Sequence, residues 1–114
     1  MSFKTEKKAD AHAEKVLAIL GDKWTGNVWE NLGWHVSWQW GSVTLYYSHY
    51  RQQYHSLIGE PNGCGGHMDL TQDGAGFSKD PQKAIRLACD YAIEVSQKEW
   101  LPIQSSVAQV RLVL

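Results

Sequence analysis

The clearest pattern along this 114-residue chain is a strict alternation of apolar and polar side chains. Every second residue over 34–40 is apolar, and Gly41-Ser42 has the composition of a two-residue hairpin turn. The alternation resumes in the six residues that follow the turn. A turn of this length pairs positions whose numbers sum to 83, such as Trp38 with Leu45, so the apolar residues of both strands share one face. The sequence therefore predicts a β-hairpin with one dry, indole-rich face.

Two helices are expected, one before and one after the hairpin. Residues 5–20 have apolar positions at helical spacing, with Thr5 as a suitable N-cap and Gly21 as a C-cap signal. Residues 81–98 begin with Pro81, a residue favoured in the first helical turn, and also have an apolar stripe. Both helices would pack on the dry face of the sheet and leave its other face exposed.

The segments between these elements are expected to be irregular, apart from one further strand. Residues 21–33 are rich in Gly and Asn and predict irregular structure, while 49–58 fit either a continuation of the hairpin or an excursion from it. Residues 59–66 predict a loop, and the alternation over 67–72 predicts a short third strand. The predicted fold class is α+β in the order α-β-β-β-α. It has a three-stranded antiparallel sheet with the helices packed on one face, and an extra C-terminal segment.

The length of the chain indicates a single domain over 1–114, with a core at about 5–100. Residues 101–114 are expected to form a C-terminal tail or an edge strand. The residues after Ser105 include Val107, Val110, Leu112 and Leu114, and such an apolar run seldom stays exposed on a monomer. We therefore expect this tail to pair with the sheet or with a second copy, which makes a homodimer through the tail one of the open alternatives.

Composition and charge narrow the classes of function. Six Trp and five Tyr are many for a short chain, and their large rings can build a core without disulfides or a structural metal. The formal net charge of −1 gives no general attraction to nucleic acid or to an anionic membrane. No signal peptide and no apolar run of ~20 residues is recognisable, so we expect no membrane association and a cytoplasmic location.

The polar face of the predicted sheet is the leading candidate for a binding surface. It would present hydroxyl groups, amides and tyrosine rings, which suit recognition of a protein partner because a tyrosine offers a large rigid surface with a polar tip. A polar outer face is also common in antiparallel sheets that bind nothing. The predicted partner-binding residues are His35, Ser37, Gln39, Tyr46, Tyr50, Tyr54, His67 and Asp69.

A metal-dependent enzyme is one alternative, centred on His35, His67 and Asp69. The motif evidence is thin: Cys64 and His67 form half of a metal motif, and His35 can meet His67 only if their strands are adjacent. A nucleophile and base could be assembled from His67 with Asp69 or from His35 with Ser48, but no oxyanion loop accompanies them. We expect no catalytic residue, no cofactor and no metal site. Metal binding is left open for His35, His49, His55, Cys64 and His67.

A nucleic-acid-binding module is the other alternative, because the order α-β-β-β-α is that of double-stranded RNA-binding domains. Those domains have a dense run of basic residues at the start of the second helix. Here the corresponding residues are Lys79, Lys83 and Arg86, with Asp80 between them. Affinity for phosphates rises with the number that are neutralised, so this set predicts weak binding.

The layout also resembles a family of small bacteriophage and prophage proteins, the phage ABA sandwich domain. The resemblance covers roughly residues 9–96 and rests on a helix over 11–20, on Gly33-Trp34 at a strand entry, and on Asp80-Pro81 followed by Ala-Ile-Arg-Leu-Ala over 84–88. It implies an α+β sandwich with no catalytic residues to transfer. It also implies a phage-encoded accessory protein in the host cytoplasm that binds a protein partner, with inhibition of a host component as one role open to it. A non-enzymatic protein of this type is the leading expectation.

Overall fold

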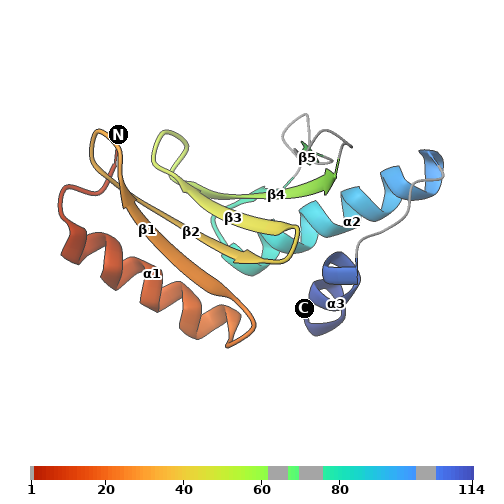
Figure 1. Ribbon diagram of the computed structural model, residues 1–114, viewed down its shortest axis with the longest axis horizontal. Coiled ribbons are helices and arrows are strands. Elements are labelled where there is room, and N and C mark those ends of the chain that lie inside the picture. Colours follow the sequence, from red (N-terminus) through yellow and green to blue (C-terminus); the bar gives the residue numbers. More distant parts are fainter. Residues whose placement is uncertain (1, 62–66, 70–75, 100–104) are drawn as a thin grey trace.

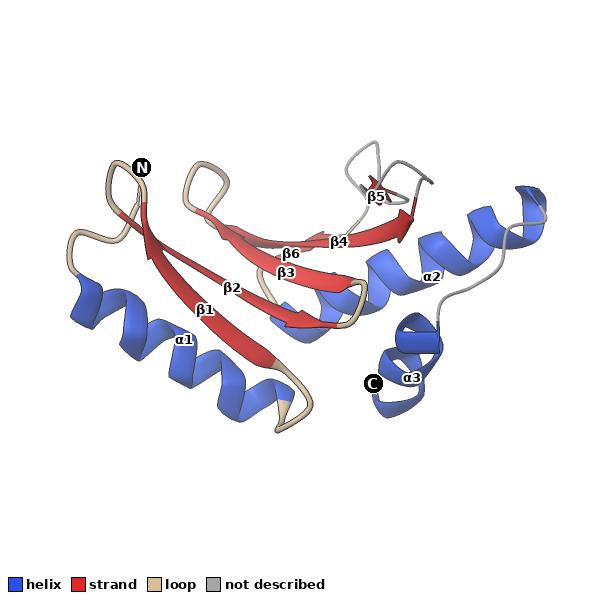
Figure 2. Cartoon of the chain, in the orientation of Figure 1, coloured by secondary structure: helices blue, strands red, loops and turns tan. Residues whose placement is uncertain are grey.

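The computed structural model describes residues 2–61, 67–69, 76–99 and 105–114. The elements are α1 (Glu6–Leu20), β1 (Thr25–Glu30), β2 (Trp34–Trp40), β3 (Val43–Ser48), β4 (Gln53–Pro61), β5 (His67–Asp69), β6 (Phe77–Ser78), α2 (Pro81–Glu99) and α3 (Ser105–Val113). The α+β class is therefore confirmed. Figures 1 and 2 show the sheet as one layer and the helices as a second layer below it.

The sheet is larger than the sequence predicted. Its strands are antiparallel in the order β1-β2-β3-β4-β5, and β6 also pairs with β4. The expectation of three strands was wrong, because it omitted β1 and β6 and left β4 ambiguous. The extra strands put the predicted hairpin in the interior of the sheet rather than at its edge.

β1 lies within residues 21–33, which were expected to be irregular. It pairs with β2 without interruption, from Thr25 opposite Gln39 to Glu30 opposite Trp34. Gly26 and Asn27 resemble turn residues when they are considered locally. Here the ladder of hydrogen bonds with β2 holds them in extended structure, which is how tertiary context overrides strand propensity.

The predicted hairpin is confirmed. β2 and β3 pair with Trp40 opposite Val43 and Trp38 opposite Leu45, the register that the Gly41-Ser42 turn requires. Gly41 has a φ of 60°, a conformation that glycine adopts readily. Trp38 and Leu45 are both fully buried, so the indole-rich face is dry as expected.

The segment that follows the hairpin forms a separate strand. A turn at 49–52 reverses the chain, and β4 then pairs with β3 from Ser48 opposite Gln53 to Val43 opposite Ile58. β4 continues to Pro61, so it enters the predicted loop over 59–66. The predicted third strand corresponds to the three residues of β5, while 70–72 lie outside the described residues.

Both predicted long helices are confirmed with their capping residues. The Thr5 hydroxyl accepts a hydrogen bond of 3.2 Å from the Lys8 amide, and the Gly21 amide donates one of 2.8 Å to the Leu17 carbonyl. α2 begins at Pro81, as its sequence indicated.

The C-terminal tail is a helix and not an edge strand. α3 packs on α2 and β3 and buries Val107 and Val110. The two valines are three residues apart, a spacing that places both on one face of a helix. Packing on α2 stabilises the helical conformation. The apolar residues that suggested a dimer through the tail are therefore partly buried within the chain itself. Leu112 and Val113 stay exposed.

One hydrophobic core lies between the sheet and the helices. Its strand residues are Val36, Trp38, Val43, Leu45, Tyr54 and Ile58, and the helices add mainly alanines and aliphatic residues from α1, α2 and α3. α1 covers β1 and β2, while α2 covers β3, β4 and β6. The side of the sheet away from this core carries no described helix (Figure 1).

Candidate functional site

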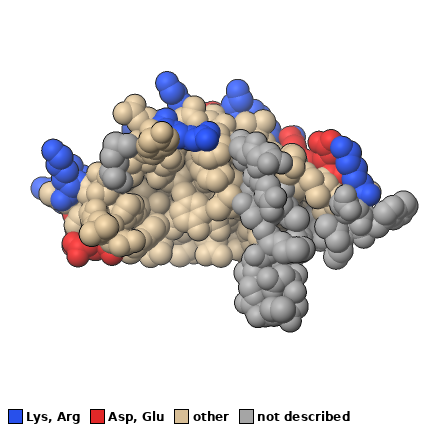
Figure 3. Space-filling model, turned by 90° about the horizontal axis from the view of Figure 1, so that it is seen from above, with Lys and Arg blue, Asp and Glu red and all other residues tan. Residues whose placement is uncertain are grey.

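The face of the sheet opposite the helices is the surface that the fold leaves available, and we call it the open face. Alternation along each strand assigns its side chains. They are Thr25, Asn27 and Trp29 of β1, His35, Ser37 and Gln39 of β2, Thr44 and Tyr46 of β3, His55 and Leu57 of β4, and Phe77 of β6. None of them is Asp, Glu, Lys or Arg. In Figure 3, which views this side, much of the described surface is uncharged, and the charged side chains lie mainly along its upper part and at its two ends.

One row of side chains crosses the open face from β1 to β6. Consecutive strand pairings place Asn27 opposite Ser37, Ser37 opposite Tyr46, Tyr46 opposite His55, and His55 opposite Phe77. Directly opposed residues in antiparallel strands have Cβ atoms about 4.5–5.5 Å apart, so these side chains are neighbours. The row thus changes along its length from an amide and a hydroxyl to three adjacent rings.

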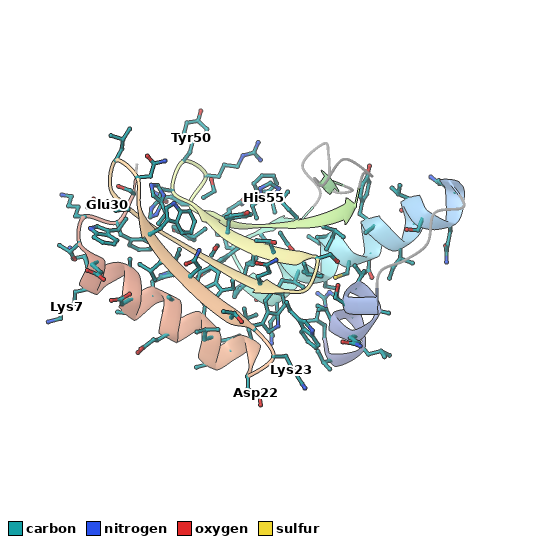
Figure 4. All side chains as sticks on the ribbon, viewed as in Figure 1. Lys7, Asp22, Lys23, Glu30, Tyr50 and His55 are labelled. Atoms are coloured by element: carbon teal, nitrogen blue, oxygen red, sulfur yellow. The ribbon has the colours of Figure 1, made fainter. Side chains whose placement is uncertain are left out.

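The aromatic end of the row is held by stacking. The rings of His55 and Phe77 lie 3.9 Å apart and are inclined by only 9°. The guanidinium carbon of Arg51 lies 4.2 Å from the centre of the Phe77 ring, which is within the range of a cation–π contact. Figure 4 shows the His55 side chain rising from the open face of β4. These contacts fix the rings in place before any partner arrives.

A second ring pair lies beside the row on β1 and β2. Trp29 and His35 stack with ring centres 5.6 Å apart and an angle of 25°. The Nε2 atom of His35 lies 2.8 Å from the Asn31 carbonyl oxygen. A carbonyl can only accept, so Nε2 carries the proton in this contact. The hydrogen bond therefore sets the orientation of the ring on which Trp29 rests.

Three of the predicted partner-binding residues lie on the open face with accessible side chains. His35 is half-buried, Gln39 is exposed, and the Tyr46 side chain is 36% exposed. Ser37 lies on the same face, but only 8% of it is exposed, so it cannot contribute the contact that was expected. Its short side chain is flanked by Asn27 of β1, a strand that the sequence analysis did not predict.

Tyr54 was wrongly placed on the open face. It pairs with Tyr47 on the side of the sheet that the helices cover, and only 9% of it is exposed. Its hydroxyl lies 2.9 Å from the Nε2 atom of His12 on α1. The register of β4 could not be read from the ambiguous residues 49–58, and a shift of one residue reverses the face of every side chain.

Three further predicted residues lie elsewhere. Tyr50 is 85% exposed, but it lies in the turn between β3 and β4 and points away from the sheet (Figure 4). His67 and Asp69 lie in β5, where the structure describes the backbone alone. Their part in a binding surface stays a prediction.

Most of the aromatic residues of the open face could not be assigned to it from the sequence. Trp29, His55 and Phe77 belong to strands that were not predicted or not resolved from the sequence. Residues 25–30 show no alternation of apolar and polar side chains, and Gly26 and Asn27 resemble turn residues, so no local signal indicated a strand there.

The residues of the metal-enzyme alternative are not brought together along the sheet. His35 is on β2 and His67 on β5, and both β3 and β4 lie between these strands. Three strand spacings amount to about 14 Å, which is too far for two ligands of one ion. Within the described ranges, no group of three or more His, Cys, Asp or Glu is arranged to hold a metal ion.

A cluster of rings and imidazoles lies on the covered side of the sheet, next to α1. His12 stacks on Tyr54 with ring centres 5.9 Å apart, and His49 contacts Phe3 edge-on at 4.5 Å and Tyr47 at 4.9 Å. Burial, followed by the charges of Lys15 and His49, lowers the pKa of His12. The pKa of His49 is lowered by burial and by the charges of His35 and of the N-terminus. Burial, and then the neighbouring Tyr47, raises the pKa of Tyr54.

The three basic residues of the nucleic-acid alternative lie around the start of α2. Lys79 precedes the helix, and Lys83 and Arg86 are on its first turns, with all three exposed. The nearby Asp80 accepts a hydrogen bond from the Gln82 amide as part of the helix start. None of the three belongs to the open face, so the structure does not combine the basic residues with the exposed rings.

No family model, no curated protein and no solved structure matches this chain. The resemblance to the phage ABA sandwich domain therefore stays a prediction.

Among the residues that the structure describes, no helix combines the length and the apolar character needed to cross a membrane.

Proposed function

We propose that this protein binds another protein through the open face of its sheet and has no enzymatic role. The observation that carries the proposal is the composition of this face: five rings over β1–β4 and β6, polar uncharged side chains between them, and no charged side chain at its described strand positions, with Arg51 of the adjoining turn against Phe77. The cores of protein–protein interfaces have this character, since charged residues are depleted there and aromatic residues are enriched.

The arrangement of the rings supports binding at low entropic cost. Trp29 is stacked on His35, and Phe77 is stacked on His55, so these side chains are already ordered in the free protein. Ordering a flexible side chain at an interface costs about 0.5–1.5 kcal/mol. A pre-ordered surface avoids part of this cost. Tyr46 lies between the two stacked pairs and combines a large ring with a hydroxyl group, which favours it as the central contact.

The partner that fits this face is a largely uncharged protein surface with exposed apolar and hydrogen-bonding groups. The amides of Asn27 and Gln39 are exposed beside the rings and can donate and accept hydrogen bonds. Arg51 lies at the margin, against Phe77. An acidic group at the rim of the partner would complement it. The phage-type accessory role, with inhibition of a host component as its effect, belongs to this proposal and rests on the sequence resemblance alone.

The structure favours a protein partner over a nucleic acid. Nucleic-acid affinity depends on neutralising several phosphates, and the open face offers only Arg51 at its margin. Single strands can stack on exposed rings, but such sites combine the rings with a positively charged groove. A gel-shift assay with duplex RNA and single-stranded DNA tests this alternative, because binding through phosphates must weaken steeply as salt rises.

The proposal is tested by recovering partners from the native host with the tagged protein and with single-residue variants. Tyr46→Ala removes the central ring, and Ile19→Ala removes an exposed apolar side chain from α1 on the other side of the molecule. Circular dichroism confirms that both variants fold. We expect one or more proteins to be recovered by the wild type and by Ile19→Ala, and to be reduced at least about tenfold with Tyr46→Ala. Equal recovery by all three forms would refute the open face as the binding site.

A further inference from the structure

The outer edge of β1 is a second candidate binding surface, because its backbone groups could pair with another strand. β1 is the last strand in the sheet order, and β2 occupies only one of its two edges. The hydrogen-bonding direction follows from Trp34, whose amide and carbonyl bond Phe3 at 3.0 and 2.9 Å on the side away from β1. Trp34 and its opposite residue Glu30 are therefore a non-hydrogen-bonded pair. Such pairs alternate with hydrogen-bonded pairs along an antiparallel ladder.

This alternation assigns the backbone groups of β1 to its two edges. Thr25, Asn27 and Trp29 direct their amides and carbonyls toward β2. Those of Gly26, Val28 and Glu30 consequently point away from the sheet. No backbone hydrogen bond from these outward groups is found in the described part of the chain. The edge is a ready template for one more strand.

β1 lacks the features by which proteins usually protect an edge strand. Its sequence is Thr-Gly-Asn-Val-Trp-Glu, without proline or lysine, and its register with β2 is free of bulges. Glu30 lies at one end of the strand, and Asp22 and Lys23 lie in the turn at the other end (Figure 4). The middle of the edge is uncharged and open to an extended segment.

The flank of α1 beside this edge indicates what kind of segment fits. The Leu17 side chain lies over Gly26, where a Cβ would meet Leu17 Cδ1 at 2.9 Å. Asp10 and Glu14 precede Leu17 by seven and three residues, so they share its flank of the helix and are exposed. His12, by contrast, reaches inward to Tyr54. The outer flank beside β1 therefore presents Asp10 and Glu14 next to Leu17, with Glu6 and Lys7 one turn nearer the start of α1.

These carboxylates argue against a second copy of the chain on this edge. Two copies joined through β1 about a twofold axis would place their α1 helices side by side, because α1 lies on β1 and β2. Asp10 and Glu14 of both copies would then lie along the same seam between the two helices. Like charges brought together in such a position disfavour the pairing of two copies.

We infer that the edge of β1 is a strand-addition site for an extended, basic segment of a partner protein. Its backbone pairs with Gly26, Val28 and Glu30, and alternate Lys or Arg side chains lie beside Asp10 and Glu14 on α1. The side chains between them continue the open face next to Trp29. This site goes beyond the proposed function, because it uses a different surface and a different partner chemistry.

The probe for this site is a capped hexapeptide that alternates Lys and Val, with a Glu-Val hexapeptide of equal length as the control. Binding is followed by amide hydrogen exchange and chemical shifts in NMR spectra of the full chain. In the free protein we expect rapid exchange at Gly26, Val28 and Glu30, and slow exchange at Asn27 and Trp29. The Lys-Val peptide should slow exchange at the first set and bind at least about tenfold more tightly than the Glu-Val peptide.

Val28→Pro supplies the matched test of the backbone contact. It removes an outward amide that β2 does not use, and proline is tolerated at such edge positions. Val28→Thr keeps the amide and is the control. Peptide binding should survive in Val28→Thr and fall at least about tenfold in Val28→Pro. If Val28→Pro does not fold, the exchange and affinity data on the wild type still decide the question.

Each result has a defined meaning. Slow exchange at all β1 amides in the free protein, together with a dimeric mass in light scattering, would show a second copy on the edge and overturn the inference. Equal or absent binding of the two peptides would also overturn it. Tyr46→Ala should leave peptide binding unchanged, and Val28→Pro should leave recovery of the open-face partner unchanged. Failure of this site and failure of the proposed function are therefore distinguishable.

Discussion

The Nε1 atom of Trp38 donates a hydrogen bond of 3.1 Å to the backbone carbonyl of Ala13 in the middle of α1. Trp38 is fully buried at the centre of β2, and Ala13 faces it from the helix. The bond satisfies the one polar atom of the largest core side chain and fixes the position of α1 along the sheet. A buried indole without such a partner would carry the cost of an unsatisfied donor.

Replacing Trp38 by Phe should destabilise the protein markedly. The change removes this hydrogen bond and leaves a cavity under α1, and we expect the free energy of unfolding to fall by about 2–4 kcal/mol. Trp40→Phe is the control, because Trp40 lies at the partly exposed end of the same strand. Urea unfolding followed by circular dichroism measures both. Equal losses in the two variants would contradict a special role for Trp38.

Stability should fall as the solution is made mildly acidic. Burial, above all, lowers the pKa of His12 and of His49 from the ordinary value of 6.5. Between the lowered pKa and 6.5 the unfolded chain binds more protons than the folded one. The stabilisation is therefore complete above pH 6.5 and is lost as pH falls through the folded-state pKa values.

The measurement is the free energy of unfolding in urea at a series of values between about pH 8 and about pH 5. A variant with His12→Gln and His49→Phe removes both titrating groups, and the phenyl ring at position 49 can keep contacts with Phe3 and Tyr47. We expect its stability to depend less on pH over this range than that of the wild type. An unchanged slope would show that other groups cause the dependence.

Gly76→Ala should be far more damaging than Gly21→Ala, although both glycines have positive φ angles of 85° and 102°. A Cβ at Gly76 would lie 2.6 Å from the backbone oxygen of Ser56, whereas nothing lies within 4 Å of one at Gly21. Gly76→Ala combines the strain of a positive φ angle with a clash that only a shift of the backbone can relieve. We expect a loss of about 1 kcal/mol for Gly21→Ala and at least about 3 kcal/mol for Gly76→Ala. Similar thermal midpoints for the two variants would contradict this.

Removing α3 should lower the free energy of unfolding and leave the oligomeric state unchanged. A form that ends at Gln104 loses the buried side chains of Val107 and Val110 and the bonds of Ser106 to the amide and hydroxyl of Ser42. We expect a loss of about 2–4 kcal/mol.

Leu112→Ala is the control for this truncation, because Leu112 is 86% exposed and should change stability by less than about 0.5 kcal/mol. Urea unfolding and light scattering are the measurements. A mass that halves on truncation would instead support the dimer through the tail that the sequence suggested.

Local sequence determined the central hairpin and the two long helices. In each case the signals lie within a few residues of one another: the turn at Gly41-Ser42 with period-two alternation, and the N-cap at Thr5 and the first-turn Pro81 with helical spacing. Such features depend on backbone geometry and on the burial of one face, and both can be read from neighbouring residues. The dry face with Trp38 and Leu45 followed from the same local register.

Tertiary structure alone decided the edge of the sheet and the face of β4. β1 contains Gly26 and Asn27, which form a strand only because β2 offers a ladder and α1 covers it. Tyr54 faces the core and His55 the open face because the pairing of β4 with β3 fixes its register, and a strand has a period of two residues. The candidate site shares this origin, since it joins side chains from five strands. Only pairing between distant segments places Asn27, Tyr46 and Phe77 in one row.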